Sequence, residues 1–380
     1  MLKKAISFCF AVFILISPCA AFSAKSYALV EQKTGRLLTE GNAEERLPMA
    51  STTKIMTGLL ACESGKLDKT FSVPEEAIHV EGSSVGLLPG EKITLRALTY
   101  GLLLESGNDA ANTIAYLLSG SIDAFAKKMN ERAAELQLRH THFCNPSGLD
   151  NKQHYTTASD LARLGAWAMS NKDFRTIAST RKIRVTYNGI KDGRALYNHN
   201  ALLRSYPGAI GIKTGFTKKS GRCLVSCASR GGVTVVCATL KDPRDWADSA
   251  ALLDYGFKIL KNERLFVACP QCQNPPEIAV PVRGGIKGRV CCRYNREISA
   301  ALRPSERAQV SMQVALPKSV RAPVKEGQKL GEVIFKLGKT ELTKTDVLAD
   351  ETVTARFNPP KRFPLWDFFN GLLKNRHRQH

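Results

Sequence analysis

Ser51 and Lys54 are the first residues of this 380-residue chain whose types and spacing suggest chemistry. They open a predicted helix over 51–62, and residues three apart on a helix share a face, so the hydroxyl and the amine lie side by side. A serine hydroxyl is a weak nucleophile until a base removes its proton. A lysine is such a base only when burial or a second cation lowers its pKa. The alternative interpretation is a capped helix with a solvated lysine, because this spacing occurs by chance roughly once or twice in such a chain.

Two later motifs favour the chemical interpretation. Ser106-Gly107-Asn108 interrupts a helical pattern, as an active-site loop would. Lys213-Thr214-Gly215 lies in a predicted strand, where the glycine lets a ligand approach the backbone. A second Lys-Thr-Gly, at residues 33–35, precedes Ser51 and is interpreted as a hairpin turn. The order Ser-x-x-Lys, Ser-x-Asn, Lys-Thr-Gly is typical of penicillin-binding proteins and class A β-lactamases.

With these motifs and their surroundings, the chain resembles the low-molecular-weight penicillin-binding proteins that are D-alanyl-D-alanine carboxypeptidases. The resemblance covers most of the chain and extends through residues 145–150 and 154–158. Gly107, where β-lactamases usually carry Asp, is similar to the carboxypeptidase version. The resemblance implies an α/β (α+β) fold. A penicillin-binding/β-lactamase-like transpeptidase domain, with an antiparallel sheet and a helical cluster, precedes a small all-β domain.

The resemblance also implies a covalent mechanism that uses no cofactor and no metal. Ser51 attacks the carbonyl of the penultimate residue of a peptidoglycan stem peptide ending in D-Ala-D-Ala, and Lys54 accepts the serine proton. Ser106 relays a proton to the departing D-Ala amine. β-Lactams are then expected to be covalent inhibitors, and no histidine is required.

The resemblance assigns further residues to substrate binding. Lys213 and Thr214 bind the terminal carboxylate, Gly215 belongs to the same strand, and Asn108 hydrogen-bonds the peptide chain. The backbone N–H groups of Ser51 and Phe216 form the oxyanion hole. Arg244 is a further candidate for the carboxylate, and an ordinary surface arginine is an equal alternative.

Two other functions remain open. A class A β-lactamase shares the acylation machinery but uses a dedicated Glu and water for hydrolysis. No Glu-x-x-Leu-Asn occurs between Ser106 and Lys213, which argues against that function. A wall-binding or β-lactam-sensing protein that is acylated without turnover would carry the same three motifs.

The N-terminus and the charge indicate where the protein works. Lys3 and Lys4 precede an apolar stretch over 5–16 and small residues over 17–24, which predicts a secretory signal at 1–24 rather than an uncleaved anchor or a buried strand. The formal net charge of +21 indicates an anionic partner. Export excludes nucleic acid and favours anionic lipid or the cell wall. We therefore expect an exported protein at the outer face of the bacterial cytoplasmic membrane.

The pattern of helices and strands divides the mature chain into three parts. Residues 25–262 mix predicted helices with an antiparallel sheet and form the catalytic domain, and residues 263–357 show the short alternating runs of a β domain. Residues 358–380 form a basic amphipathic tail, interpreted as an anchor that lies in the interface of an anionic membrane. The alternative is a helix that docks on the protein's own β domain.

The cysteines fall into two groups. Cys223, Cys227 and Cys237 lie on a predicted hairpin and are interpreted as small buried side chains. A second group, formed by Cys269, Cys272, Cys291 and Cys292, is expected to be oxidised to disulfides in the exported protein. A zinc site and free thiols are the alternatives.

Overall fold

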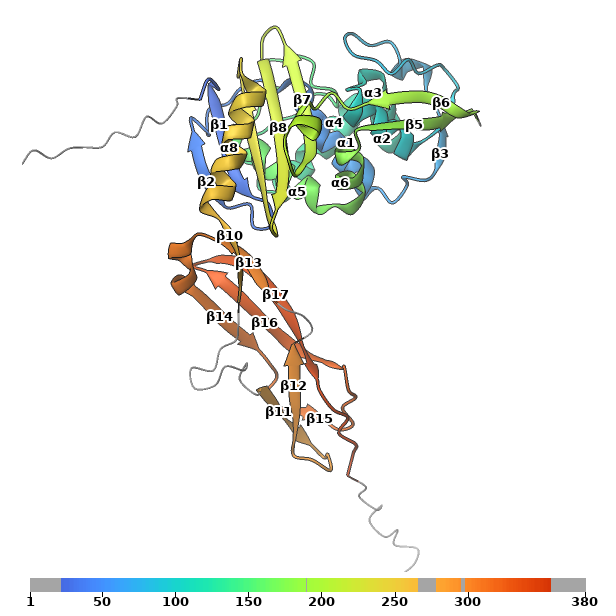
Figure 1. The fold of residues 1–380 in the computed structure, drawn as a ribbon. Coiled ribbons are helices and arrows are strands. Elements are labelled where there is room, and N and C mark those ends of the chain that lie inside the picture. The colour runs from blue at the N-terminus through green and yellow to red at the C-terminus, as the bar shows by residue number, and fades with distance from the viewer. Residues whose placement is uncertain (1–21, 189, 266–277, 295–297, 357–380) are drawn as a thin grey trace, which may run out of the picture. The chain divides into compact units, whose positions relative to one another are not determined.

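The computed structural model describes residues 22–356 except 189, 266–277 and 295–297 (Figure 1). The chain forms two compact units that divide after Ile259. Most of the predicted signal and the whole predicted tail lie outside the described residues, as do Cys269 and Cys272. No helix within the described ranges is both long and apolar enough to cross a membrane.

A five-stranded antiparallel sheet organises the first unit, in the order β2-β1-β9-β8-β7. The strands are β1 (Ser26–Glu31), β2 (Leu37–Gly41), β7 (Ala209–Thr217), β8 (Gly221–Arg230) and β9 (Val233–Leu240). β8 and β9 are buried along most of their length because helices cover both faces. β7 forms one edge of the sheet and β2 the other.

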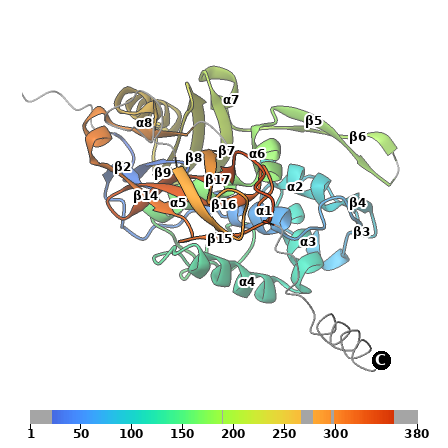
Figure 2. The ribbon, with the colours of Figure 1, turned by 90° about the horizontal axis from the view of Figure 1, so that it is seen from below.

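Helices α5 (Ala158–Ser170) and α8 (Asp245–Ile259) pack on opposite faces of this sheet (Figures 1 and 2). Gly165 of α5 comes close to Val236, whereas Gly256 of α8 comes close to Val235. Successive side chains of a strand point to opposite faces, so the two contacts place the helices on different sides. Glycine at each crossing lets the helix backbone approach the strands.

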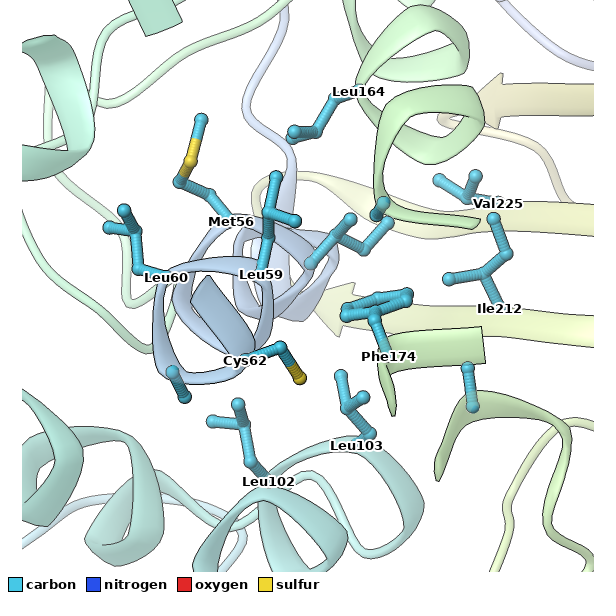
Figure 3. Packing of buried hydrophobic residues seen from close by; sticks show 14 of the residues in the cluster. Met56, Leu59, Leu60, Cys62, Leu102, Leu103, Leu164, Phe174, Ile212 and Val225 are labelled. Atoms are coloured by element: carbon cyan, nitrogen blue, oxygen red, sulfur yellow. The ribbon is translucent and has the colours of Figure 1, made fainter. Parts of the chain in front are cut away.

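A helical cluster fills the rest of the first unit. Cys62 of one helix lies on the side facing Leu102 and Leu103 of a second, and Met56, Leu59 and Leu60 belong to the same buried cluster (Figure 3). The cluster consists of α1 (Lys54–Glu63), α2 (Leu95–Leu104), α3 (Asn108–Ser119), α4 (Ile122–Glu135), α6 (Lys172–Ser179) and α7 (Leu202–Ser205). The remaining elements are the short helices η1 (Ala50–Thr53) and η2 (Glu75–Ala77), and the sheet of β3 (Thr70–Ser72), β4 (Lys92–Thr94), β5 (Lys182–Tyr187) and β6 (Ile190–Tyr197).

The beginning of the predicted helix over 51–62 is corrected by the structure. Ser51 lies in the 3₁₀ turn η1, and the α-helix begins only at Lys54. Ala50 adopts a left-handed φ of +47°, which prevents a regular helix from extending back through the serine. The turn therefore carries the Ser51 side chain while the helix carries the lysine.

The second unit is all β. Its six-stranded sheet has the order β14-β16-β17-β12-β11-β15, and β10 pairs with β13 beside it. Two apolar clusters form its interior. Cys291 and Cys292 are half-buried neighbours in this sheet. The strands are β10 (Lys261–Arg264), β11 (Ile278–Arg283), β12 (Arg289–Tyr294), β13 (Ser299–Leu302), β14 (Val310–Ala315), β15 (Val320–Arg321), β16 (Lys329–Leu337) and β17 (Thr340–Ala349), with the short helix η3 (Pro304–Gln309).

Candidate active site

A cleft of about 330 Å³ in the first unit brings the three motifs together. Ser51 of η1, Ser106 at the start of the Ser-Gly-Asn motif, and Thr214 to Phe216 of β7 all line it. Other lining residues were not singled out from the sequence: Ser83, His199, Arg222, Asp245 and Trp246. The predicted order of motifs therefore corresponds to one cavity, although the motifs lie on separate elements.

The hydroxyl groups of the two threonines that follow Ser51 hold the turn that presents it. Thr52 Oγ1 donates to the carbonyl of Met49 at 2.6 Å, and Thr53 Oγ1 donates to the carbonyl of Ala50 at 2.8 Å. Both threonines are buried. The left-handed backbone at Ala50 costs energy, and these two hydrogen bonds help to keep it in place.

His154 contacts the same turn through the hydroxyl of Thr53. Its Nδ1 accepts from the backbone N–H of Cys144 at 3.0 Å, so the ring proton resides on Nε2, which lies 2.7 Å from Thr53 Oγ1. Burial, with a smaller contribution from His142, lowers the pKa of His154 to about 4. The imidazole is thus neutral near pH 7 and acts as a fixed donor to the turn.

Lys54 lies next to Ser51, and its amine has three polar neighbours. Its Nζ lies 2.9 Å from Ser51 Oγ, 2.7 Å from Asn108 Oδ1 and 2.6 Å from the carbonyl of Ser147. The side chain is fully buried, and burial, followed by the charge of Lys213, lowers its pKa well below the ordinary lysine value. Asp109 acts in the opposite direction.

The three contacts of Lys54 determine how a neutral amine must be oriented. The oxygens of Asn108 and Ser147 can only accept, so they use both N–H groups of the neutral amine. The lone pair is left for the third neighbour, Ser51 Oγ. The surroundings therefore lower the pKa of the amine and, in its neutral form, direct its basic lone pair at the serine hydroxyl.

Asn108 connects this base to the wall of the cleft. Its Oδ1 accepts from Lys54, and its Nδ2 donates to the carbonyl of Glu81 at 2.6 Å. The neighbouring Asp109, which the sequence analysis did not single out, accepts from Ser84 Oγ and from the backbone of Val85. The residue predicted to bind the peptide chain thus also positions the base and the loop over 81–87.

Ser106 and Lys213 are the remaining polar residues that were predicted to take part in the reaction. Ser106 has a left-handed φ of +63°, and its hydroxyl has no hydrogen-bond partner among the described residues. Lys213 is 1% exposed, and its amine donates to the carbonyl of Thr214 at 3.0 Å. Burial lowers the pKa of Lys213 to about 7. An anion in the cleft would stabilise the protonated form of this amine.

Strand β7 passes directly beside the nucleophile. A Cβ built on Gly215 would lie 3.0 Å from the backbone nitrogens of both Ser51 and Thr52, so a side chain there would press on the turn. Phe216 follows and is 65% exposed at the cleft. The close approach of strand and turn is what an oxyanion hole built from both backbones would require.

The predicted Arg244 is not among the residues that line the cleft. Its guanidinium lies 3.4 Å from Asp248 one helical turn away. Arg222 lines the cleft instead, paired with Asp245 at 2.8 Å and with its guanidinium 5.8 Å from the Trp246 ring. Arg222 is opposite Phe216 across the β7–β8 hairpin, a pairing that was not predicted from the sequence.

His199 is the other residue missed at the cleft. Its Nε2 lies 3.1 Å from Glu105, the residue before Ser106. The sequence offered no signal for it, since it follows the unpredicted hairpin β5–β6. Within the described ranges, no group of three or more His, Cys, Asp or Glu side chains is arranged to hold a metal ion.

Comparison with known proteins gives this geometry a family. A family model described as D-alanyl-D-alanine carboxypeptidase matches residues 15–244, and one described as the C-terminal domain of penicillin-binding protein 5 matches residues 279–355. D-alanyl-D-alanine carboxypeptidase DacF of Bacillus subtilis (strain 168) is 32% identical over 340 residues, covering 87% of this chain and 86% of that protein. DacC of Escherichia coli (strain K12) is 29% identical over 346 residues, covering 87% and 84%.

Solved structures of similar proteins support the same family. Penicillin-binding protein 5 from Haemophilus influenzae is 25% identical with a TM-score of 0.62, covering 88% of this chain and 98% of that one. The Streptomyces K15 DD-transpeptidase is 32% identical with a TM-score of 0.60, covering 63% and 98%. These neighbours confirm the predicted fold class. The chain therefore belongs to the D-alanyl-D-alanine carboxypeptidase family of penicillin-binding serine peptidases.

Proposed function

We propose that this chain removes the terminal D-alanine from peptidoglycan pentapeptide stems through an acyl-enzyme on Ser51. The observation that carries the proposal is the buried amine of Lys54, whose lone pair is left for Ser51 Oγ by two carbonyl acceptors. A solvated lysine would be protonated near neutral pH and could not take the serine proton. Family membership supports the same activity.

Acylation proceeds by attack of Ser51 Oγ on the carbonyl carbon of the penultimate D-Ala while its proton passes to Lys54. Backbone N–H groups of Ser51 and Phe216 stabilise the oxyanion that exists only in the tetrahedral state. Ser106, whose hydroxyl lines the cleft, relays a proton to the leaving nitrogen as the C–N bond breaks. Water then attacks the ester, which returns Ser51 and releases the shortened stem.

Lys213 and Thr214 bind the terminal carboxylate in this proposal. An amine buried to 1% exposure has little water to stabilise its charge, so a carboxylate partner binds it strongly when protonated. Gly215 and Phe216 present the strand to the substrate backbone, while Asn108 has one amide hydrogen left for the peptide. We assign the cleft's arginine to Arg222 rather than Arg244, because Arg222 lines the cavity.

The first test uses penicillin and a pentapeptide ending in D-Ala-D-Ala. Wild-type protein should form a covalent adduct at Ser51 and release free D-Ala with repeated turnover, whereas Ser51→Ala should do neither. Adduct formation without turnover on the peptide would favour a β-lactam sensor. Rapid turnover of penicillin itself would favour a β-lactamase.

A second test separates the two lysines. Lys54→Arg should abolish acylation, because a guanidinium stays protonated near neutral pH and cannot act as the base. Lys213→Arg should retain part of the acylation, because a cation for the carboxylate persists. The opposite order of severity would exchange their assignments.

We also propose that the protein is exported and held at the outer face of the cytoplasmic membrane by residues 358–380. Leu365, Trp366, Phe368 and Phe369 would enter the interface, and each nearby Lys or Arg would contribute about 1 kcal/mol on an anionic surface. Deleting the chain from Phe363 should release an active enzyme that no longer sediments with anionic liposomes. If the intact protein stays in the supernatant at low salt, or the truncated protein unfolds, the tail is a structural element.

A further inference from the structure

A second hollow in the catalytic unit has a volume of about 530 Å³ and shares no lining residue with the cleft. We call it the Trp167 hollow. Thr34 and Gly35 of the β1–β2 turn, Gln137 and Arg139 after α4, and Arg163 and Trp167 of α5 line it. The turn joins β1 to β2, the edge strand at the end of the sheet opposite to β7. The second Lys-Thr-Gly sequence, at residues 33–35, therefore lies at this hollow.

The rim of the hollow is already ordered by buried contacts. The carboxylate of Glu31 accepts from the backbone N–H groups of Lys33 and Thr34 at 3.0 and 2.9 Å. Gln32 Nε2 donates to the carbonyl of Ala166 in α5 at 2.9 Å, which fixes the turn to the helix. A preformed concave surface binds a ligand without the loss of conformational entropy that ordering its own loops would cost.

Trp167 is the unusual member of this surface. Its side chain is 53% exposed, although the flanking Ala166 and Ala168 are buried against the sheet. Packing of α5 therefore does not require an indole at this position. An exposed indole over a hollow offers a flat apolar face with an N–H donor at its edge, the side-chain type that most often anchors a ligand.

The polar groups around the indole are of mixed character. The guanidinium groups of Arg139 and Arg163 have no ion-pair or hydrogen-bond partner within the described ranges. Glu44 pairs with His140 at 2.9 Å on the same rim. Carboxylates disfavour a simple anion and two unpaired guanidinium groups disfavour a simple cation, whereas a hydroxyl-rich ligand uses both donors and acceptors.

We propose that the Trp167 hollow binds the glycan strand of peptidoglycan, with a sugar ring stacked on Trp167 and the hydroxyl and N-acetyl oxygens of the strand facing Arg139 and Arg163. The choice of this polymer rests on the proposed function, because the stem peptides that the cleft would cleave are attached to that strand. The hollow then retains the enzyme on its polymer while the cleft works on individual stems.

The test measures binding of the full chain to glycan strands from which the stem peptides have been removed. Binding is followed by tryptophan fluorescence and by co-sedimentation at high salt, where adsorption of a basic protein to a polyanion is screened. Trp167→Ala should weaken binding by about tenfold, the usual loss for a central aromatic anchor. Trp167→Phe should recover part of it, and D-Ala release from a free pentapeptide should be unchanged in both.

Two further variants sharpen the result. Arg163→Gln should also weaken binding, because it removes the guanidinium donors that face the sugar oxygens, and it serves if Trp167→Ala fails to fold. Tyr255→Ala removes an aromatic ring that is 40% exposed on α8, away from the hollow, and should bind like wild type.

Equal binding by wild type and Trp167→Ala would overturn the proposal. Displacement of the strand by free stem peptide alone would also overturn it, since a peptide would then be the occupant. The proposed function is judged separately, because D-Ala release from a soluble pentapeptide needs no glycan. Trp167-dependent binding without D-Ala release would leave the glycan site standing and reject the carboxypeptidase assignment.

Discussion

The amine of Lys54 lies 2.7 Å from the side-chain oxygen of Asn108, and this contact joins the base of the first motif to the last residue of the second. A neutral amide at this position accepts a hydrogen bond without adding charge. The contact therefore orients the amine and leaves its pKa low, which a carboxylate in the same place would not do.

Asn108→Asp should convert this orienting contact into an ion pair. A carboxylate within 4 Å raises the pKa of a lysine by roughly 1–3 units, so Lys54 would hold its proton and acylation at pH 7 should fall by about 10- to 1000-fold. The rate constant for acylation by penicillin, measured from pH 5 to 9, should recover toward the alkaline end. Asn108→Ala is the matched control, because it removes the acceptor without adding charge. An Asn108→Asp profile with no alkaline displacement would contradict the role given to this contact.

Lys213 should set the alkaline limit of activity. Its pKa is lowered to about 7, and the protonated form is the one that binds a carboxylate, so kcat/KM for a D-Ala-D-Ala peptide should decline as the pH rises above about 7. Bound carboxylate raises the pKa, so the decline in kcat should occur at a higher pH than the decline in kcat/KM. Lys213→Arg stays charged and should lose the alkaline decline. An unchanged decline in that variant would assign it to another group.

Gly148 should be intolerant of any side chain. It has a left-handed φ of +91°, and a Cβ there would lie 1.9 Å from the carbonyl oxygen of Ala50. Gly148→Ala should lower the free energy of unfolding by roughly 2–4 kcal/mol and slow acylation, because the turn that carries Ser51 must move.

Gly120 provides the control for that substitution. Its φ of +79° is similar, but no atom lies within 4 Å of its Cβ position. Gly120→Ala should cost about 1 kcal/mol from backbone strain alone and leave acylation unchanged. Similar acylation rates in the two variants would show that the Ala50 contact does not position the nucleophile.

His154 should make the fold sensitive to acid. Its pKa is about 4 in the folded chain against 6.5 ordinarily, so between these values the unfolded chain binds the extra proton. The free energy of unfolding should fall by about 3 kcal/mol as the pH drops from 6.5 to 4. His154→Gln keeps a donor and an acceptor but does not titrate, so urea unfolding curves should lose that part of the pH dependence. The exposed His79→Gln should keep it.

The sequence predicted most of what lies in long periodic segments. Lys213-Thr214-Gly215 lies in strand β7 as predicted, and the predicted hairpin that carries Cys223, Cys227 and Cys237 is β8–β9, because burial of both faces imposes a run of apolar residues. The hairpin β5–β6 was missed because β5 has one buried residue, Val185, and so shows no apolar alternation. α6 was missed because only Asn171 separates its eight residues from α5.

The residues of the candidate site likewise fall into a group that was predicted and a group that was missed. Its motifs were predicted because their chemistry depends on short spacings, as between Ser51 and Lys54. Arg222, His199 and Trp246 were not, because only the fold brings them to the cleft. The turn at Ala50 was also not predicted, because a hydrophobic pattern does not indicate which alanine has a left-handed backbone.

The position of β7 at the edge of its sheet also bears on aggregation. It pairs with β8 on one side, and no described strand pairs with its other side. An open strand edge beside the exposed ring of Phe216 is a template on which a second extended chain could add. The open edge that would admit a substrate backbone is thus a liability at high protein concentration. A β-lactam that fills the cleft should suppress self-association as well as activity.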